Sequence, residues 1–425
     1  MSNAGNWPFR TLVGVISTPT LRYDGSILDQ QGYDPRTHLY LESEIVLPLL
    51  SKSPTRDDAE RAVHLLEDLL SEFPFVNNAS KSVALSAIIS AVARNMFDVV
   101  PAHGARAPTA GTGKSYLFDV AAAILLGERC PVISLSSDSE GETEKRIVGM
   151  ALSGHQIIHL DNVNGTLGGD ALCQLIERPT CELRPLGQSA LARVDNRAII
   201  FFNGNNCHVR GDMTRRVLLA ELDARMEKPA EREFTGNPVA KVMADRGKYI
   251  AACMTILRAY IAAGRPKQSF PPMNSFGEWS GTVRSALVWL GRADPCETIA
   301  KARDEDPELQ KIAAFIAAAK PHADGAQKAI PVNKLIELSN KTKGDGYGDW
   351  VQTNPELHTF MQEFVDRGNK PNPQRLGRWL GRFKGRVVGD DSDGEYVQMR
   401  IASTYNSKRK SDDWYIETLS SVGGA

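Results

Sequence analysis

The strongest constraint on the fold is a glycine-rich turn that leads directly into a helix-forming segment. The turn has the sequence PTAGTGKS at 108–115, and the apolar segment SYLFDVAAAILLG overlaps its end. Such a turn aims successive backbone N–H groups and the positive end of the helix dipole at one place, which suits a chain of phosphates. We therefore expect a phosphate-binding loop, called the P-loop below. Its nine residues are Pro108, Thr109, Ala110, Gly111, Thr112, Gly113, Lys114, Ser115 and Tyr116.

Two side chains of the P-loop carry the chemistry. Lys114 is expected to reach the β- and γ-phosphates of a nucleotide, and the Ser115 hydroxyl is expected to bind Mg²⁺. The sequence departs from the general pattern GxxxxGK[ST] at Pro108, which replaces the first glycine, and the preceding strand (HGARA) is only weakly apolar. The alternative is a glycine-rich helix N-terminus that binds no ligand.

Short apolar segments alternate with helix-forming segments between about 98 and 225. The clearest are PVISL (131–135), QIIHL (156–160) and RAIIFF (197–202), and their alternation predicts a parallel α/β sheet. Asp161 follows QIIHL, and a carboxylate at that strand end can hold a Mg²⁺-bound water and orient a γ-phosphate. We therefore expect Asp161 to share the metal with Ser115. The alternative is an aspartate that caps a turn.

Asn162 follows Asp161 at a position where many ATPases carry a catalytic glutamate. We include it among the candidate catalytic residues, although an amide cannot take a proton from an attacking water. The nearest acidic side chains upstream are Glu140, Glu142 and Glu144, but a solvated helix start explains these three equally well.

Polar residues also follow the third predicted strand. In RAIIFFNGNN we prefer Asn205 to Asn203 as the side chain that contacts the γ-phosphate and the attacking water; the alternative is an ordinary Asn-Gly turn. Arg215 and Arg216 then lead into the apolar run VLLAEL. A guanidinium there can neutralise charge on a γ-phosphate bound to a neighbouring subunit, although surface arginines are common.

The rest of the chain divides into segments of different character. Residues 1 to about 50 carry turn signals typical of a β-rich module, an amphipathic helix pattern begins near 53, and 240–305 is mainly helical. After a break at 321–327, helices precede a strand pair (GRVVG and YVQMRIA), which is typical of a winged helix. We therefore expect an N-terminal β/helical module (1–80), an ATPase core (81–225), a helical subdomain (226–320) and a winged-helix-like domain (321–425).

Composition excludes several classes of protein. The 425 residues are 42% hydrophobic and 24% charged with a net charge of -1, which excludes a uniformly basic nucleic-acid coat and a disordered chain. No apolar run approaches the roughly 20 residues of a membrane span. The six cysteines show no zinc-ligand or disulfide spacing. We expect a cytoplasmic protein with reduced thiols and no membrane association.

Taken together, five ordered motifs make the chain resemble a known family. They are APTAGTGKS, IIHLDNVNG, ELRPLGQS, FFNGNN with RGDMTRRVLLAEL, and LGRWLGRFKGRVVG. In this order they resemble the helicase portion of phage, prophage and plasmid primase–helicases, an AAA+ group close to the superfamily-three helicases. The resemblance runs from about 6 to 417, and the N-terminal LVGVISTPTLRYDGSIL is also similar to the segment before the ATPase core of such proteins.

The resemblance implies an α/β AAA+ fold and an ATP hydrolase that uses ATP and Mg²⁺. It implies a ring, expected to be a homo-hexamer, that moves on single-stranded or forked DNA without sequence preference in a bacterial or phage-infected cell. It also implies an arginine acting on the neighbouring subunit's nucleotide, carried onto Arg216 first and Arg215 second. The chain is too short for an added primase domain, so a separate primase is an expected partner.

Two basic segments are candidate DNA contacts. Residues 181–198 have the form of a β-hairpin, and phosphate contacts by such side chains are independent of sequence. In QRLGRWLGRFKGR (374–386) basic residues can line one helix face while Trp379 and Leu380 turn inward. The alternative for both is a solvated surface. The candidates are Arg184, Gln188, Arg193, Arg197, Arg375, Arg378, Arg382 and Lys384.

Three functions from different classes fit a P-loop. The first is a ring-forming DNA helicase, which the ordered motifs favour. The second is an initiator, loader or remodelling ATPase that binds DNA without unwinding it, which Asn162 supports. The third is a P-loop kinase of a small molecule, against which the Asn205 and arginine positions argue.

Overall fold

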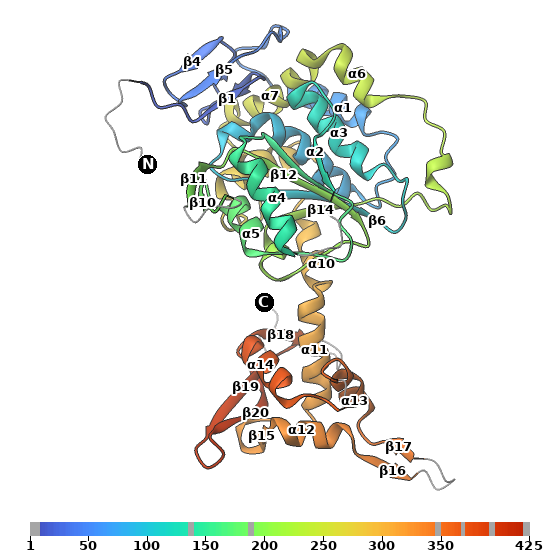
Figure 1. Cartoon of the computed structure of the whole chain (residues 1–425). Helices are drawn as coiled ribbons and strands as arrows, with labels where there is room; N and C mark the ends of the chain where they lie inside the picture. The colour runs from blue at the N-terminus through green and yellow to red at the C-terminus, as the bar shows by residue number, and fades with distance from the viewer. Residues whose placement is uncertain are drawn as a thin grey trace. The chain divides into compact units, whose positions relative to one another are not determined.

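The computed structural model describes residues 9–134, 140–185, 191–344, 350–366, 370–390 and 396–419. The chain forms two compact units, Met1–Arg303 and Asp304–Ala425 (Figure 1). The boundary between the two units lies between residues 303 and 304, whereas the sequence predicts that the last domain begins at the break at 321–327. Residues 226–303, expected as part of a separate helical subdomain, pack within the first unit.

A parallel sheet of five strands forms the centre of the first unit, as the alternating pattern predicts. The strand order is β14-β6-β12-β8-β7. Because β12 lies between β6 and β8, the carboxyl ends of these three strands are adjacent. The bounds are β6 (Ala102–Ala107), β7 (Val132–Ser134), β8 (Ile157–Asp161), β12 (Ile199–Asn205) and β14 (Val217–Glu221).

Helices cover both faces of this sheet. The helix α3 (Lys114–Leu126) contacts β6 and β12, and α4 (Glu140–Leu152) contacts β8. The crossovers from β6 to β7 and from β7 to β8 run in opposite directions across the sheet, so right-handed connections place α3 and α4 on opposite faces (Figure 1). The helix α2 (Asn78–Ala93) contacts the sheet, α3 and α7 (Arg246–Ala262), which explains why it is apolar all round and buried.

The amphipathic pattern near residue 53 is helix α1 (Arg56–Leu69). Thr55 caps it, with Asp58 completing a capping box, and its apolar face packs on α7. The remaining helices and strands between residues 166 and 304 follow in chain order. They are β9 (Thr166–Leu167), α5 (Asp170–Glu177), β10 (Thr180–Leu183), β11 (Ala192–Asp195), β13 (His208–Val209), α6 (Pro238–Ala244), α8 (Gly277–Trp279), α9 (Ser285–Trp289) and α10 (Glu297–Asp304).

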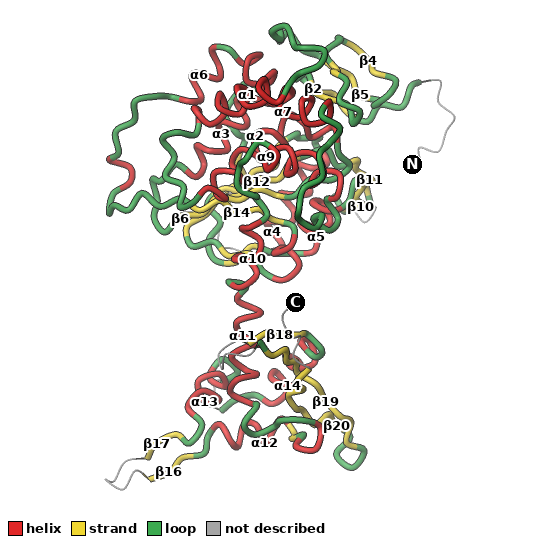
Figure 2. The backbone as a smooth tube through the Cα atoms, turned by 180° about the vertical axis from the view of Figure 1, so that it is seen from behind, coloured by secondary structure: helices red, strands yellow, loops and turns green. Residues whose placement is uncertain are grey.

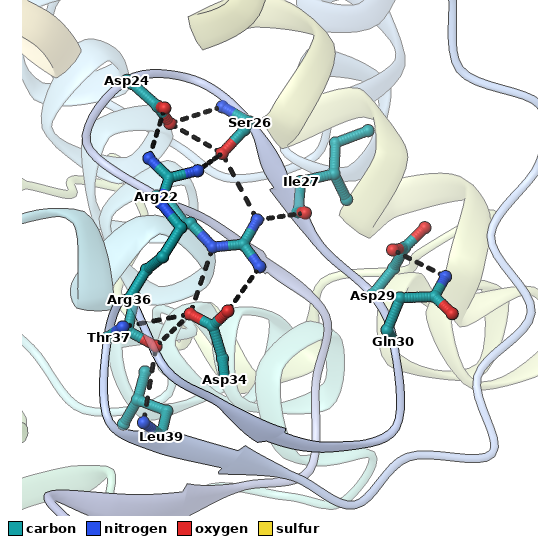
Figure 3. A network of polar contacts seen from close by, with 10 residues as sticks. All are labelled: Arg22, Asp24, Ser26, Ile27, Asp29, Gln30, Asp34, Arg36, Thr37 and Leu39. Atoms are coloured by element: carbon teal, nitrogen blue, oxygen red, sulfur yellow. Dashed lines mark hydrogen bonds and ion pairs between the residues drawn. The ribbon is translucent and has the colours of Figure 1, made fainter.

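The β-rich N-terminal module is present as the sequence predicts. Its strands are β1 (Gly14–Ile16), β2 (Thr20–Leu21), β3 (Ile27–Leu28), β4 (Gly32–Asp34) and β5 (Leu39–Leu41). Arg22 holds the module together by donating to the Asp34 carboxylate at 2.8 Å and to the Ile27 carbonyl at 2.6 Å (Figure 3). The hydrogen bonds from Arg22 and Thr37 lower the pKa of Asp34 to about 2, so this network stays ionised at neutral pH.

The second unit combines helices with an antiparallel sheet of order β15-β20-β19-β18 (Figure 2). The predicted strand pair is β18 with β19, and the sequence pattern did not predict β20, which pairs with β19 over its whole length. The core of this unit includes Phe315 and Phe360, and the half-buried Trp379 packs against it. The elements are α11 (Pro307–Ala319), β15 (Ile330–Pro331), α12 (Val332–Ser339), β16 (Thr342–Gly344), β17 (Trp350–Gln352), α13 (Pro355–Gln362), α14 (Pro373–Phe383), β18 (Val387–Asp390), β19 (Val397–Asn406) and β20 (Ser411–Leu419).

Two features of composition can be checked in the structure. None of the described helices is long and apolar enough to cross a membrane. All six cysteines are free thiols, and each is buried or half-buried.

Candidate active site

The P-loop lies between the end of β6 and the start of α3, at the carboxyl edge of the sheet. Gly111 and Gly113 both have positive φ, 78° and 94°, which explains the two glycines. Gly113 is the N-cap of α3, so the unpaired N–H groups of the first helical turn and the helix dipole face the loop. This backbone is therefore organised for an anion.

Lys114 is buried inside the turn of the P-loop. Its Nζ donates to the Thr109 carbonyl at 2.8 Å and to the Thr112 hydroxyl at 3.1 Å. Burial lowers the pKa of the Lys114 ammonium from its ordinary value, and the Asp161 carboxylate opposes that shift. The ammonium is thus held close to the groups that would surround a phosphate.

The Ser115 hydroxyl, the Asp161 carboxylate and the Asn203 amide meet beside the P-loop. Ser115 Oγ donates to Asp161 Oδ1 at 2.9 Å. Asn203 Nδ2 donates to the same carboxylate oxygen at 2.8 Å and to Ser115 Oγ at 3.1 Å. Three segments that are far apart in the sequence therefore place one residue each at a single point.

This donor set fits Mg²⁺ bound together with phosphates. Hydroxyl and carboxylate oxygens are the ligands that Mg²⁺ prefers, and it usually binds through one or two protein groups while phosphates and waters complete its coordination. Among the described residues, no group of three or more His, Cys, Asp or Glu side chains could hold a metal ion. Ser115 and Asp161 could hold a Mg²⁺ ion whose remaining ligands come from phosphates and waters.

The structure places the two asparagines of β12 differently. Alternation along the strand puts Asn203 and Asn205 on the same face. Asn203 is buried and bonded to Asp161. The preferred Asn205 lies two residues nearer the strand end, and its buried Oδ1 has no hydrogen-bond partner among the residues that the structure describes. The sequence does not show that Asn203 lies beside Asp161, because this contact depends on the order of the strands in the sheet.

Asn162 has a conformational reason to be asparagine. Its φ is 55°, in the left-handed region that asparagine enters more readily than other side chains with a Cβ. The side chain is exposed at the start of the loop after β8. Of the acidic alternatives, Glu142 and Glu144 are exposed near the start of α4, where Glu142 pairs with Lys145 at 2.5 Å.

Gly204 allows the loop after Asp161 to approach β12 closely. A Cβ at this position would lie 2.0 Å from the Val163 carbonyl oxygen and 2.9 Å from Cys207 Cβ. The loop is held there because the Val163 N–H donates to the Asn203 carbonyl at 2.8 Å. The close approach keeps Asp161 and Asn203 side by side.

We expect Gly204→Ala to lower the free energy of unfolding of the first unit by about 1–3 kcal/mol, because the backbone at Val163 must move. Urea unfolding followed by circular dichroism measures this change. Gly149→Ala is the control, since Gly149 lies in α4 with open space around it and alanine there should stabilise by about 0.5–1 kcal/mol. A Gly204→Ala protein as stable as the wild type would contradict the close approach.

The arginine pair is split between a buried and an exposed side chain. Arg216, the first choice from sequence, is 5% exposed, and its guanidinium donates twice to Glu177 of α5. Arg215 is 49% exposed, with weaker contacts to Glu177 at 3.5 Å and Asp212 at 3.3 Å. Within this chain Arg216 is therefore the buried member of the pair, bonded to Glu177, and Arg215 is the exposed member.

Both arginines lie near the amino ends of the parallel strands, whereas the P-loop of their own chain lies at the carboxyl ends. They directly precede β14, whose first residue, Val217, pairs with Ala102 at the start of β6. The P-loop follows the other end of β6, after Ala107. At about 3.3 Å per residue the two ends of β6 are roughly 17 Å apart, farther than an arginine side chain extends. Neither arginine can reach a phosphate in its own P-loop.

A cavity of about 370 Å³ adjoins the P-loop. Its lining includes Phe73, Thr112, Gly113, Tyr116, Arg232 and Phe234. The Phe73 and Tyr116 rings stack at 6.3 Å, and the Arg232 guanidinium lies over the Phe234 ring at 5.1 Å. The cavity is thus lined by aromatic rings and lies next to the loop that would hold phosphates.

The predicted hairpin is the antiparallel pair β10–β11, directly before β12. Arg184 and Arg193 are exposed, Arg197 is half-buried, and Gln188 lies outside the described residues. On α14 the basic side chains are exposed, while Leu376, Leu380 and Phe383 are buried. The exposed basic residues of α14 and its C-terminal end are Arg375, Arg378, Arg382 and Lys384.

Some of these basic side chains already have acidic partners. Arg375 pairs with Asp366 at 2.8 Å, and Arg382 pairs with Glu308 at 3.0 Å. Trp379 packs against four phenylalanines of the second core, so it anchors the helix, as the sequence predicts.

Comparison with known proteins gives weak similarities. Neither a protein-family model nor a curated protein sequence matches the chain. Two structures of the NrS-1 C-terminal region, apo form A, are 14% and 13% identical, each with a TM-score of 0.35. The matches cover 67% and 72% of this chain and 58% and 60% of those chains. The chain therefore spans about three fifths of their length.

A structure of JCV helicase with a bound small molecule is 14% identical, with a TM-score of 0.21. The match covers 59% of this chain and 68% of that chain. Because all three TM-scores are below 0.5, the function of the site has to be derived from its own geometry.

Proposed function

We propose that the protein is an ATP-dependent, ring-forming DNA helicase or translocase of phage or mobile-element replication, with an AAA+ core. The observation that carries the proposal is the meeting of Ser115, Asp161 and Asn203 beside the P-loop. A glycine-rich loop at a helix N-terminus suits a phosphate chain, and the paired oxygens suit its Mg²⁺. Hydrolysis of ATP is the reaction such a site serves best.

Each residue of the site has a role in this proposal. Lys114 neutralises charge on the β- and γ-phosphates, and Ser115 and Asp161 hold the Mg²⁺ that is bound with them. Asn205, at the strand end beyond Asn203, is proposed to contact the γ-phosphate and the attacking water. The exposed Asn162 takes no proton, so water is activated by orientation and charge rather than by a carboxylate at that position.

The nucleobase is proposed to occupy the aromatic cavity beside the P-loop. A volume of about 370 Å³ is within the range of small-ligand pockets, and stacked rings favour a planar group.

Hydrolysis is proposed to depend on a neighbouring subunit. Arg215 lies too far from its own P-loop to act there, yet it is exposed beside Asp212 at the other edge of the sheet. In a closed ring this edge of one subunit can face the P-loop of the next, because the contact is head-to-tail. We therefore assign the transition-state arginine to Arg215 and a supporting role to Arg216 through Glu177. The proposed ring is a hexamer.

The β10–β11 hairpin and α14 are the proposed DNA contacts. Exposed arginines on the hairpin can track phosphates without reading bases. In the second unit, α14 followed by the β19–β20 hairpin is a winged-helix arrangement, and residues 408–410 (KRK) form the turn of the wing.

Replacing both Arg378 and Lys384 by alanine is expected to weaken binding of single-stranded DNA and reduce its salt dependence. A plot of log K against log salt has a negative slope, and the magnitude of this slope should decrease by about 0.7 for every phosphate that the variant no longer neutralises. Fluorescence anisotropy at several salt concentrations measures the slope. Lys334→Ala, on α12, removes the same kind of charge and should leave the slope unchanged. Equal slopes for the double variant and the wild type would exclude binding through α14.

Strand separation tests the whole proposal. With ATP and Mg²⁺, the protein should displace one strand of a forked duplex, and a non-hydrolysable analogue should not support displacement. The second candidate is an initiator, loader or remodelling ATPase, which the exposed amide at Asn162 favours. That protein would hydrolyse ATP and bind DNA without separating strands. A small-molecule kinase would instead transfer phosphate to an acceptor other than water.

A further inference from the structure

A buried histidine lies directly beneath the candidate metal site. His159 is 0% exposed and precedes Asp161 by two residues on β8, so the two side chains share one face of the strand. Its Nε2 lies 2.6 Å from Asn203 Oδ1. A chain of polar contacts therefore runs from His159 through the Asn203 amide to Asp161 and Ser115.

The chemistry of these groups fixes the direction of every hydrogen bond in the chain. An ionised carboxylate only accepts, so the Asn203 side chain must turn its NH₂ group toward Asp161. The amide oxygen then faces His159, and since that oxygen also only accepts, Nε2 must carry the proton. His159 Nδ1 is buried and has no hydrogen-bond partner within the described part of the chain, which suits an unprotonated nitrogen.

Aromatic packing holds the His159 ring in this orientation. Phe118, on the helix that begins with the P-loop lysine, meets the ring edge-to-face at 5.2 Å. Phe118 also stacks on Phe201 of β12 at 4.6 Å. The ring therefore has a fixed place between α3 and the sheet.

We propose that His159 is a positioning residue for the metal site. Its Nε2–H fixes the Asn203 amide, which in turn directs the Asp161 carboxylate toward Ser115. The inference rests on the proposed Mg²⁺-nucleotide function of that site. Groups that orient metal ligands commonly change metal affinity about 10–100-fold when removed.

The test compares two replacements of His159. Leucine fills the apolar volume without a donor, whereas glutamine places an N–H near the position of Nε2. With ADP bound, His159→Leu should weaken Mn²⁺ affinity about 10-fold, as measured by electron paramagnetic resonance of free Mn²⁺. His159→Gln should recover most of this loss. In hydrolysis assays His159→Leu should raise the Mg²⁺ concentration needed for half-maximal rate more than it lowers kcat at saturating Mg²⁺.

His103 provides a matched control. It is also 0% exposed and pairs with the same residue, Phe201, from the other side of β12, but its Nε2 contacts Ser86 rather than the site. His103→Leu should leave Mn²⁺ affinity unchanged. Equal affinity in the wild type and His159→Leu, no recovery with His159→Gln, or an equal loss in His103→Leu would each overturn the inference.

A separate readout needs no metal or activity. Nitrogen-15 shifts of the labelled His159 ring should report the neutral form protonated at Nε2, and a ring protonated at Nδ1 alone would overturn the proposal. If the wild type shows neither Mn²⁺ binding with ADP nor ATP turnover, the proposed function fails. If the wild type shows both and His159→Leu matches it, only the positioning role fails.

Discussion

Lys114→Ala is expected to reduce ATP hydrolysis at least about 100-fold, to the background of the assay. The ammonium is held within the P-loop turn by the Thr109 carbonyl and the Thr112 hydroxyl, where it would meet the β- and γ-phosphates. Removing one donor that faces developing charge typically costs about 10²–10³-fold in rate. Phosphate release from ATP at saturating Mg²⁺ measures the effect.

Lys81→Ala is the control for this variant. Lys81 is a partly exposed lysine whose ammonium pairs with Glu67 at 3.3 Å, outside the P-loop, so its replacement should leave hydrolysis within about 2-fold of the wild type. Thermal unfolding of both variants checks that each is folded. A folded Lys114→Ala protein that hydrolyses ATP at the normal rate would refute the P-loop assignment and the proposed function with it.

Arg215→Ala is expected to lower turnover about 10³-fold while nucleotide affinity stays within a few-fold of the wild type. Its guanidinium lies at the sheet edge opposite its own P-loop, so it is proposed to act on the nucleotide of the next subunit. An arginine supplied in this way is worth about 10³–10⁵ in rate. Binding of a fluorescent ATP analogue and phosphate release measure affinity and turnover separately.

Mixing Arg215→Ala with Lys114→Ala protein tests action between subunits. In mixed rings some interfaces combine an intact P-loop with an intact Arg215, so activity should exceed that of either variant alone. No recovery in rings shown to be mixed would exclude action in trans. Arg216→Ala should differ, because it removes the partner of Glu177 inside the unit and so should lower the unfolding temperature.

Arg215 and Arg216 differ in a property that the local sequence does not determine, namely their burial. The sequence identifies the pair and its place before an apolar strand, but both residues look alike there. Arg216 is buried because α5 brings Glu177 to it, and that meeting depends on how the helix packs beside β14. The sequence favours Arg216 through the resemblance alone, and only the structure shows that Arg216 is buried and Arg215 exposed.

The candidate active site also combines features that local sequence predicts with contacts that depend on the fold. The sequence predicts the P-loop, the helix after it and a strand that ends in Asp161, because glycines, helix periodicity and apolar runs act over a few residues. It gives no indication that Asn203 contacts Asp161, since only the insertion of β12 between β6 and β8 brings these two side chains together. It contains no signal for His159, which reads as one polar residue in an apolar strand.

Local sequence by itself determined the elements of this protein: the P-loop turn, the parallel strands, the amphipathic helices α1 and α14, and the hairpin before β12. Tertiary structure decided which side chains meet. It placed Asn203 on Asp161, Glu177 on Arg216 and three aromatic rings beside the P-loop. The physical reason is that backbone preferences and hydrophobic periodicity act between near neighbours. Contacts between distant residues exist only once strand order and helix packing are fixed.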